Sequence, residues 1–185
     1  MKVKICGITN YEDAAMAADL GADALGFNFF PKSRRYITPE EARKIIRRIP
    51  PFIVTVGLFV NAAEQSQVSA IAHAAGVQVL QLHGDETPEY CSGLSGWTLI
   101  KALRIGESGI REDPEAFPVQ AFLLDSRNDT LFGGTGKIFD WNLAKNIRRV
   151  RPIILAGGLT TENVREAIRI VDPYAVDVCS GVESA

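Results

Sequence analysis

Two side chains that can exchange protons end short apolar stretches of this chain. Cys6 ends the stretch VKIC (3–6), and Asp125 ends QAFLLD (120–125). A cysteine thiolate can act as a base or as a nucleophile. A carboxyl group can act as an acid at neutral pH when burial raises its pKa. The two residues therefore indicate acid–base chemistry, provided that the fold brings them to one site.

Both residues also have structural interpretations. A buried cysteine is usually a small apolar side chain, and an aspartate at a strand end can cap a helix or form a salt bridge. Position favours a catalytic role more for Asp125 than for Cys6, because an unpaired carboxylate is costly to bury on an apolar strand. Cys6 could alternatively pair with His83 as the nucleophile of a cysteine hydrolase.

Two further polar residues end or interrupt apolar stretches, His83 in QVLQLH and Asp177 in YAVDVC. His83 could simply donate a hydrogen bond to a loop carbonyl. We interpret Asp177 as structural or as a carboxylate that orients a substrate. Cys91 and His73 fall in helical patterns, and we interpret both as structural.

Two glycine-containing loops could bind an anion. Gly157-Gly158 precede a helix that we expect to start at Thr160 or Thr161, and Ser180-Gly181 follow the last apolar stretch. Glycine lets the backbone approach a ligand closely, and free N–H groups at a helix start favour an anion. The alternative is that these glycines only serve tight turns.

Two longer loops have less specific patterns. LFGGTGKIF (131–139) lacks the Walker A pattern, because Leu131 stands where that pattern needs glycine and Ile138 where it needs Ser or Thr. We expect it to form a flap over the site. The loop FFPKSRRYI (29–37) carries three basic side chains that could each pair with a carboxylate, namely Lys32, Arg34 and Arg35.

Short apolar runs alternate with amphipathic segments along the chain. The runs are rich in β-branched residues, which predicts strands, and signals such as Thr38-Pro39 predict helix starts between them. The predicted strands are 3–6, 23–29, 53–60, 78–83, 98–102, 120–125, 152–156 and 174–179. The predicted helical segments are 9–21, 38–49, 61–76, 87–94, 112–117, 140–147 and 160–171.

This alternation predicts an α/β fold with a parallel sheet. Eight strand–helix units favour a closed (β/α)₈ TIM barrel over an open doubly wound sheet, with all of residues 1–185 in a single domain. The chain ends just after the eighth predicted strand, so we expect the barrel to lack its C-terminal eighth helix.

Alternation along the strands predicts which side chains share a face. Lys4 and Cys6 lie opposite the apolar residues of their strand, and His83, Asp125 and Asp177 lie opposite the apolar residues of theirs. We expect the apolar faces to pack against helices and the polar faces to line the mouth of the barrel, where such folds place their chemistry. Lys4 could lower the pKa of the neighbouring thiol, and so could the N-terminus of the first predicted helix near Thr9-Asn10; the sequence does not decide between them.

Composition excludes several classes of partner and cofactor. The 185 residues carry a formal net charge of −2, which gives no sign of the basic patch typical of nucleic-acid binding. No apolar run reaches the roughly 18 residues of a membrane span, and the N-terminus has no secretory signal pattern. Three cysteines without a C-x-x-C pair and two histidines without zinc spacing predict a cytoplasmic protein without disulfides or metal.

Eight motifs, in order along nearly the whole chain, match one enzyme family. They are KICGIT (4–9), GADALGFNFFPKSRRYI (21–37), VGLFVN (56–61), LQLHGDE (80–86), LLDS (123–126), GGTGKIFDW (133–141), LAGGLTTENV (155–164) and AVDVCSGVES (175–184). On these motifs the chain resembles the phosphoribosylanthranilate isomerases of tryptophan biosynthesis. The resemblance implies a single (β/α)₈ barrel that needs no metal and no organic cofactor.

The resemblance also implies a reaction and a small-molecule substrate. It is an Amadori rearrangement that converts N-(5-phosphoribosyl)anthranilate into 1-(2-carboxyphenylamino)-1-deoxyribulose 5-phosphate. By resemblance, Cys6 is the general base, Asp125 the general acid, and Arg35 the contact for the anthranilate carboxylate. The remaining residues implied for substrate binding are His83, Asp177, Gly157, Gly158, Ser180 and Gly181. A monomer and a homodimer are both compatible with the sequence.

Two other functions remain as alternatives. A related barrel isomerase of histidine biosynthesis resembles this chain too, but that family has an aspartate where Cys6 stands. A catalytically inactive protein that binds phosphosugars would keep the glycine loops and lose turnover. An assay of isomerase activity on the purified chain distinguishes these cases.

Overall fold

The computed structural model describes residues 1–105, 110, 112–125 and 149–183. Its strands are β1 (Lys2–Cys6), β2 (Ala24–Asn28), β3 (Val54–Phe59), β4 (Val79–Leu82), β5 (Thr98–Arg104), β6 (Ala121–Asp125), β7 (Ile153–Leu155) and β8 (Ala175–Val178). Its helices are α1 (Tyr11–Asp19), α2 (Pro39–Ile46), α3 (Gln65–Ala75), α4 (Pro88–Ser92) and α6 (Val164–Val171), with 3-10 helices η1 (Pro114–Ala116) and η3 (Ser180–Val182). The predicted flap at 131–139 and the helix at 140–147 lie outside the described residues.

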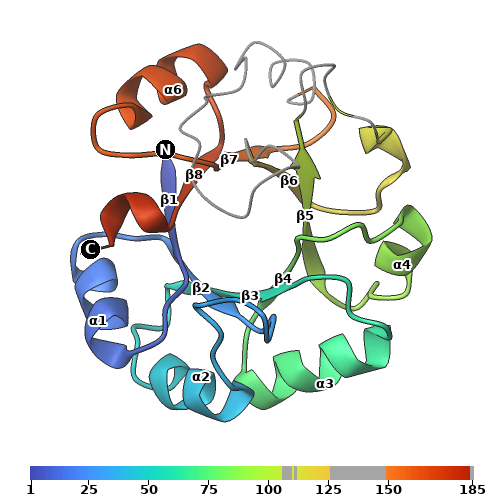
Figure 1. Cartoon of the computed structure of the whole chain (residues 1–185), viewed down its shortest axis with the longest axis horizontal. Helices are drawn as coiled ribbons and strands as arrows, with labels where there is room; N and C mark the ends of the chain where they lie inside the picture. The colour runs from blue at the N-terminus through green and yellow to red at the C-terminus, as the bar shows by residue number, and fades with distance from the viewer. Residues whose placement is uncertain (106–109, 111, 126–148, 184–185) are drawn as a thin grey trace.

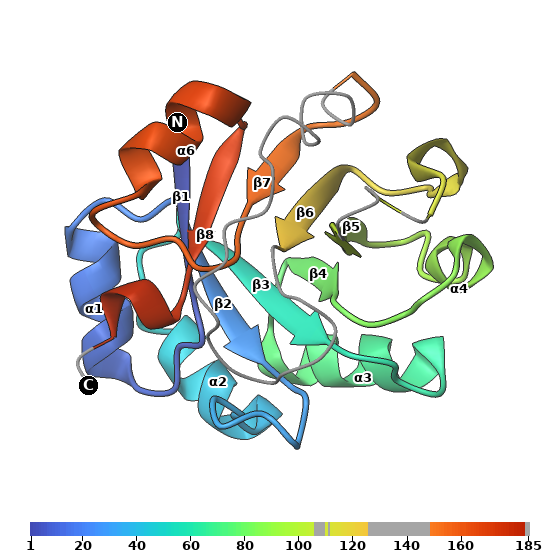
Figure 2. The ribbon, with the colours of Figure 1, turned by 45° about the horizontal axis from the view of Figure 1, so that its top comes forward.

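The eight strands form one closed parallel barrel in chain order, and β1 pairs with β8 to complete it. The labelled helices lie outside this ring of strands (Figure 1). The tilted view shows the strands inclined around a common interior (Figure 2). The predicted (β/α)₈ fold is therefore confirmed. After β8, the described residues form η3 and end at Glu183.

The barrel has two apolar layers, as alternation along the strands predicts. The outer layer joins strand residues such as Phe27, Leu80 and Phe122 to the covering helices. The inner layer is smaller and fills the barrel interior. Its buried members are Val56, Ile100, Ala102, Leu123, Ile154, Ala156 and Ala175. The side chains expected to face the helices and the interior do so on β1, β4, β6 and β8.

Side-chain caps fix where most of the described helices begin. Asn10, Thr38 and Thr87 each accept a hydrogen bond from the backbone N–H three residues later, at the starts of α1, α2 and α4. Such caps satisfy N–H groups that have no partner within the helix. Among the described residues, no helix is long and apolar enough to cross a membrane.

The predicted start of the last helix at Thr160 or Thr161 is wrong. Helix α6 begins at Val164, after Asn163. The Asn163 amide accepts from the Thr160 N–H and donates to the Gly158 carbonyl. These bonds hold residues 158–163 in turns, because the side chain of Asn163 competes with the helix for the same backbone groups.

Candidate active site

A buried ion pair joins the first and last strands at the barrel interior. Lys4 of β1 and Asp177 of β8 are register partners, and the Lys4 Nζ lies 2.8 Å from the Asp177 Oδ1. Lys4 is 3% exposed and Asp177 is 8% exposed. Burial alone would lower the pKa of Lys4, but the Asp177 carboxylate and the Cys6 thiol raise it above its ordinary value. Lys4 therefore remains a cation inside the barrel.

Cys6 shares the interior face with Lys4 and follows it by two residues on β1. Burial raises the pKa of the Cys6 thiol, the Lys4 ammonium opposes that effect, and Asp177 adds to it. The Gly7 backbone N–H also favours the thiolate. The net direction is upward, so most of the Cys6 population carries its proton at neutral pH.

Gly26 of β2 provides the space that Lys4 and Cys6 occupy. Cys6 and Gly26 are register partners on neighbouring strands. A Cβ at Gly26 would lie 2.7 Å from the Cys6 Sγ and 3.1 Å from the Lys4 Nζ. A Cβ at this position would therefore force the ends of Cys6 and Lys4 to shift, so glycine keeps the space that these two side chains occupy.

A second polar group lies at the C-terminal ends of β4 and β6. The His83 Nε2 lies 3.2 Å from the Asp125 Oδ2, and the His83 Nδ1 lies 2.9 Å from the Gln81 Nε2. Gln81 is fully buried and Asp125 is 8% exposed. Asp125 ends β6, and β6 pairs with β5, which separates it from β4.

Asp177 connects the two polar groups electrostatically. Burial raises the pKa of Asp177 most, and Lys4 opposes that shift. Smaller effects come from His83, which lowers the pKa of Asp177, and from Asp125, which raises it. Cys6, Asp125, His83 and Asp177 therefore share one electrostatic environment at one end of the barrel, as the sequence predicts.

Arg35 reaches this end of the barrel from the loop between β2 and α2. Asn28 shapes that loop by donating to the Ser33 Oγ and accepting from the Phe30 N–H, and the Ser33 Oγ accepts from the Arg35 N–H. The Arg35 guanidinium donates from Nε and Nη2 to the two carboxylate oxygens of Glu183, with an Nη2 to Oε2 distance of 2.6 Å. This two-point contact is the geometry with which arginine binds a carboxylate.

Gly7 allows Arg35 to lie close to the catalytic candidates. Gly7 has a φ of +89°, which favours glycine. A Cβ at Gly7 would overlap the Arg35 side chain and would lie 3.1 Å from the Cys179 Sγ. The hydrogen bonds to Glu183 raise the pKa of Arg35 most, and Cys179 and Cys6 add to that rise. The arginine therefore lies over the ends of β1 and β8.

The two glycine loops pack against each other after β7 and β8. Gly157 and Gly158 have φ values of +81° and +64°. A Cβ at Gly181 would overlap the carbonyl oxygen of Leu159 and lie 3.3 Å from the Thr160 Cα. The predicted loops thus meet, and only glycine fits at their contact.

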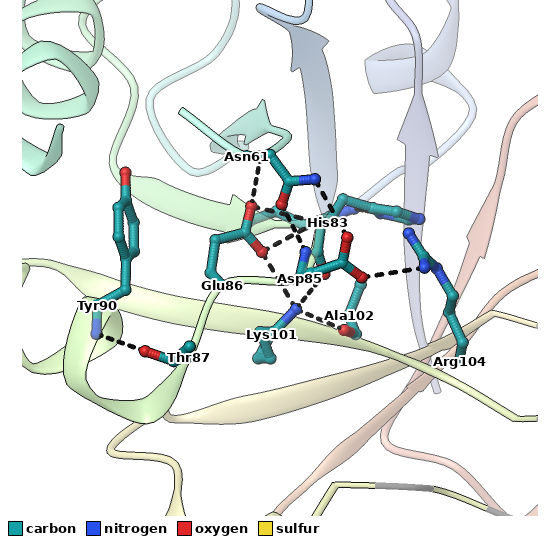
Figure 3. A network of polar contacts seen from close by, with 11 residues as sticks. Asn61, His83, Asp85, Glu86, Thr87, Tyr90, Lys101, Ala102 and Arg104 are labelled. Carbon is teal, nitrogen blue, oxygen red and sulfur yellow. Dashed lines mark hydrogen bonds and ion pairs between the residues drawn. The ribbon is translucent and has the colours of Figure 1, made fainter. Parts of the chain in front are cut away.

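A buried network lies beside the site and was not predicted. Glu86 accepts hydrogen bonds from the Asn61 and Gly84 N–H groups, and its Oε2 lies 3.1 Å from the Lys101 Nζ (Figure 3). Lys101 also donates to the carbonyls of Gly84 and Ala102. The sequence feature that could have indicated this network is Lys101, a charged residue between Leu99 and Leu103 on the outer, apolar face of β5. Two more contacts escaped prediction, Gln81 with His83 and Arg35 with Glu183.

The residues interpreted as structural lie away from the polar groups. Cys91 is fully buried in α4 within the outer core. His73 of α3 contacts the Ser69 carbonyl and packs against the Trp97 ring. Within the described residues, no group of three or more His, Cys, Asp or Glu side chains is arranged to hold a metal ion.

Comparison with known proteins identifies the family. Residues 3–185 match the family described as N-(5'phosphoribosyl)anthranilate (PRA) isomerase. The chain belongs to that family. It is 50% identical to the N-(5'-phosphoribosyl)anthranilate isomerase of Pelobacter propionicus, over all of this chain and 88% of that protein. It is 52% identical to the same enzyme of Geotalea uraniireducens, over all of this chain and 90% of that protein.

Solved structures of the isomerase family have the same barrel. The phosphoribosyl anthranilate isomerase of Thermotoga maritima is 45% identical, with a TM-score of 0.90, over all of this chain and 90% of that one. A phosphoribosyl anthranilate isomerase in complex with reduced 1-(o-carboxyphenylamino)-1-deoxyribulose 5-phosphate is 42% identical, with a TM-score of 0.86 over the same shares. The chain is thus a member of an isomerase family of tryptophan biosynthesis.

Proposed function

We propose that this chain catalyses the Amadori rearrangement of N-(5'-phosphoribosyl)anthranilate, with Cys6 as general base and Asp125 as general acid. The observation that carries the proposal is that both residues end their strands, β1 and β6, at the same end of the barrel. Each also lies beside a partner that can stabilise its ionised form. That partner is Lys4 for Cys6 and His83 for Asp125. The family to which the chain belongs supports the same reaction.

Asp125 acts first in this proposal. Its carboxyl group donates a proton to the ribose ring oxygen while the bond from that oxygen to carbon 1 breaks. The lone pair of the anthranilate nitrogen then forms a carbon–nitrogen double bond, which leaves a cationic iminium. Asp125 becomes a carboxylate in this step, and the His83 ring lies within hydrogen-bonding distance to stabilise it.

Cys6 acts second, as a thiolate that removes the proton from carbon 2. The electron pair of that C–H bond forms a double bond between carbons 1 and 2, and the iminium pair returns to nitrogen. Loss of the enol proton and protonation of carbon 1 give the ketone product. The cationic iminium makes the carbon 2 proton acidic, so a small thiolate population is sufficient. Lys4 supplies that population by opposing the effect of burial.

Substrate binding is proposed to use Arg35 at one end and the glycine loops at the other. The Arg35 fork already binds one carboxylate, that of Glu183, so it has the geometry for the anthranilate carboxylate. Gly157, Gly158, Ser180 and Gly181 would hold the phosphate, at the loops where barrels of this type commonly bind it. His83 and Asp177 would line the space between.

An assay of substrate fluorescence in the purified chain tests the proposal. We expect Cys6→Ala and Asp125→Asn each to lower kcat by about 10²- to 10⁴-fold, the usual contribution of a positioned acid or base. Cys91→Ala and Asp23→Asn are matched controls, because Cys91 lies in α4 and Asp23 pairs with Lys2 near the opposite ends of the strands. Substrate binding without turnover in the unmodified chain would instead support an inactive phosphosugar-binding protein.

The cysteine hydrolase alternative receives no support from the contacts of His83. In the part of the chain that the structure describes, His83 contacts Gln81 and Asp125, whereas the groups that act on the Cys6 thiol are Lys4, Asp177 and the Gly7 N–H. A cysteine nucleophile needs its histidine within hydrogen-bonding distance. A covalent acyl adduct on Cys6 would revive that alternative.

A further inference from the structure

Gln81 is a buried polar side chain that contacts the proposed acid only through another residue. It lies on β4 between Leu58 of β3 and Ile100 of β5 in the strand register. Its amide nitrogen lies 2.9 Å from the His83 Nδ1, and its amide oxygen has no hydrogen-bond partner among the described residues. A fully buried amide with one unused atom is costly. The hydrogen bond that it makes to His83 among the described residues is therefore a candidate reason for its presence.

The contact determines where His83 carries its proton. The Gln81 amide nitrogen can only donate a hydrogen bond, so the His83 Nδ1 must accept it. A neutral imidazole that accepts at Nδ1 carries its hydrogen on Nε2. The His83 Nε2–H then donates to the Asp125 Oδ2, 3.2 Å away. The hydrogen bonds thus run in one direction, from Gln81 to His83 and from His83 to Asp125.

We propose that Gln81 is a positioning residue that fixes His83 as the Nε2–H tautomer, so that His83 stabilises the carboxylate formed when Asp125 gives up its proton. This inference rests on the proposed role of Asp125 as the general acid. The bond from His83 is weaker while Asp125 is neutral and stronger once the carboxylate carries charge. It therefore stabilises the transition state of ring opening more than the ground state.

The opposite orientation of the Gln81 amide makes a different, measurable prediction. With the amide oxygen against Nδ1, a neutral His83 would carry its hydrogen on Nδ1, and its Nε2 would face Asp125 as an acceptor. That arrangement would suit only a protonated Asp125 and would oppose loss of its proton. The ring nitrogen of His83 that carries the hydrogen therefore distinguishes the two orientations of the Gln81 amide.

The chain contains an internal reference for this measurement. His73, the other of its two histidines, places its Nδ1 2.8 Å from the Ser69 carbonyl oxygen. A carbonyl only accepts hydrogen bonds, so His73 carries its hydrogen on Nδ1. The two histidines should be opposite tautomers in the same sample. Histidine-selective ¹⁵N labelling and a two-bond ¹H–¹⁵N spectrum of the full chain near pH 8 report both, and His73→Gln assigns the signals.

We expect the His83 Nε2 to be protonated and its Nδ1 to be unprotonated. Gln81→Glu should move a proton onto the His83 Nδ1, because a carboxylate there can only accept. Gln81→Met removes the donor at similar volume. It should lower the single-turnover rate by about tenfold to a hundredfold, with KM unchanged, as loss of a bond to a charged group made mainly in the transition state would do.

Gln78→Met is the matched control, because Gln78 precedes β4 and bonds to the Thr55 backbone instead of to His83. It should leave the His83 tautomer and the single-turnover rate unchanged. A Gln81→Met variant that loses stability but keeps the rate of the unmodified chain would reduce Gln81 to a structural role. If that variant does not fold, the spectrum of the unmodified chain still decides, since an Nδ1–H on His83 overturns the inference.

The test separates this inference from the proposed function. The tautomer is measured without substrate, so it does not depend on the reaction. Normal turnover in Asp125→Asn would refute the catalytic role of Asp125 whatever the tautomer is. An Nδ1–H tautomer in the unmodified chain, combined with an inactive Asp125→Asn, would refute the role of Gln81 and leave the proposed function intact.

Discussion

Replacing Lys4 by methionine should make Cys6 a weaker acid. The Lys4 Nζ and the Cys6 Sγ lie 3.1 Å and 2.7 Å from the same point, the position of a Cβ at Gly26. The Lys4 ammonium is the main group that opposes the effect of burial on the pKa of Cys6. Methionine keeps most of the length of the lysine side chain and removes its charge.

The size of the effect follows from Coulomb's law. Two opposite charges about 5 Å apart interact by roughly 3 kcal/mol at an effective dielectric constant of about 20. That energy corresponds to about two pKa units. Part of it is offset, because Asp177 also loses its partner and becomes easier to protonate. We therefore expect the pKa of Cys6 to rise by about one to two units.

The reaction of Cys6 with a small aromatic disulfide, followed from about pH 7 to about pH 12, measures this change. A rise of two units lowers the thiolate population at neutral pH by about 100-fold. A more basic thiolate is also more nucleophilic, with a Brønsted coefficient of about 0.4–0.5, so the rate at fixed pH falls only about tenfold. The pH midpoint of the rate shows the full shift. Peptide mapping by mass spectrometry separates Cys6 from Cys91 and Cys179.

A second substitution should shift the midpoint in the opposite direction. Asp177 raises the pKa of Cys6, so Asp177→Asn should lower it and increase the thiolate population at pH 7. Each single change leaves one buried charge without its partner, at a cost of about 3–5 kcal/mol. Circular dichroism should therefore be recorded with every titration, to show that each variant is folded. If a single variant unfolds, the double variant Lys4→Met/Asp177→Asn, which removes both charges, is titrated in its place. Unchanged midpoints in all folded variants, or a lower midpoint in Lys4→Met, would refute the reasoning.

Three further changes test other parts of the site. Arg35→Met should raise KM by about tenfold or more with little change in unfolding free energy, because it removes a two-point contact to a carboxylate; an unaltered KM removes Arg35 from substrate binding. Lys101→Met should lower the unfolding free energy in urea by about 3–5 kcal/mol, since it leaves the Glu86 carboxylate buried and unpaired by a cation; a loss below about 1 kcal/mol contradicts this. Gly26→Ala should displace the Cys6 thiol and lower kcat by about tenfold or more while the barrel still folds, and wild-type kcat would show that the space is not needed.

The positions of the strand residues could be predicted because strand geometry has a fixed period of two. Once Val3 and Ile5 face the helices, Lys4 and Cys6 must face the interior, and the structure has them there. A parallel closed sheet then brings the C-terminal ends of all strands to one end of the barrel. No knowledge of individual contacts was required for either step.

The contacts that escaped prediction depend on side-chain geometry between distant or competing groups. Arg35 and Glu183 are 148 residues apart in the chain, so no local pattern indicates their pairing. Lys101 occupies an apolar face because the Gly84 and Ala102 carbonyls and Glu86 surround its ammonium. Helix α6 begins later than predicted because the Asn163 amide forms hydrogen bonds with the nearby backbone in a turn.

The pairing of Lys4 with Asp177 links the order of synthesis to the appearance of activity. Lys4 leaves the ribosome before Asp177, which follows 173 positions later in the chain. Until β8 docks beside β1, the lysine has no counterion and the thiol two residues after it lacks its finished surroundings. An unfinished chain therefore carries Cys6 without the strand ends that place Asp125 and Asp177 near it, and the complete set of proposed catalytic groups is assembled only when the ring closes.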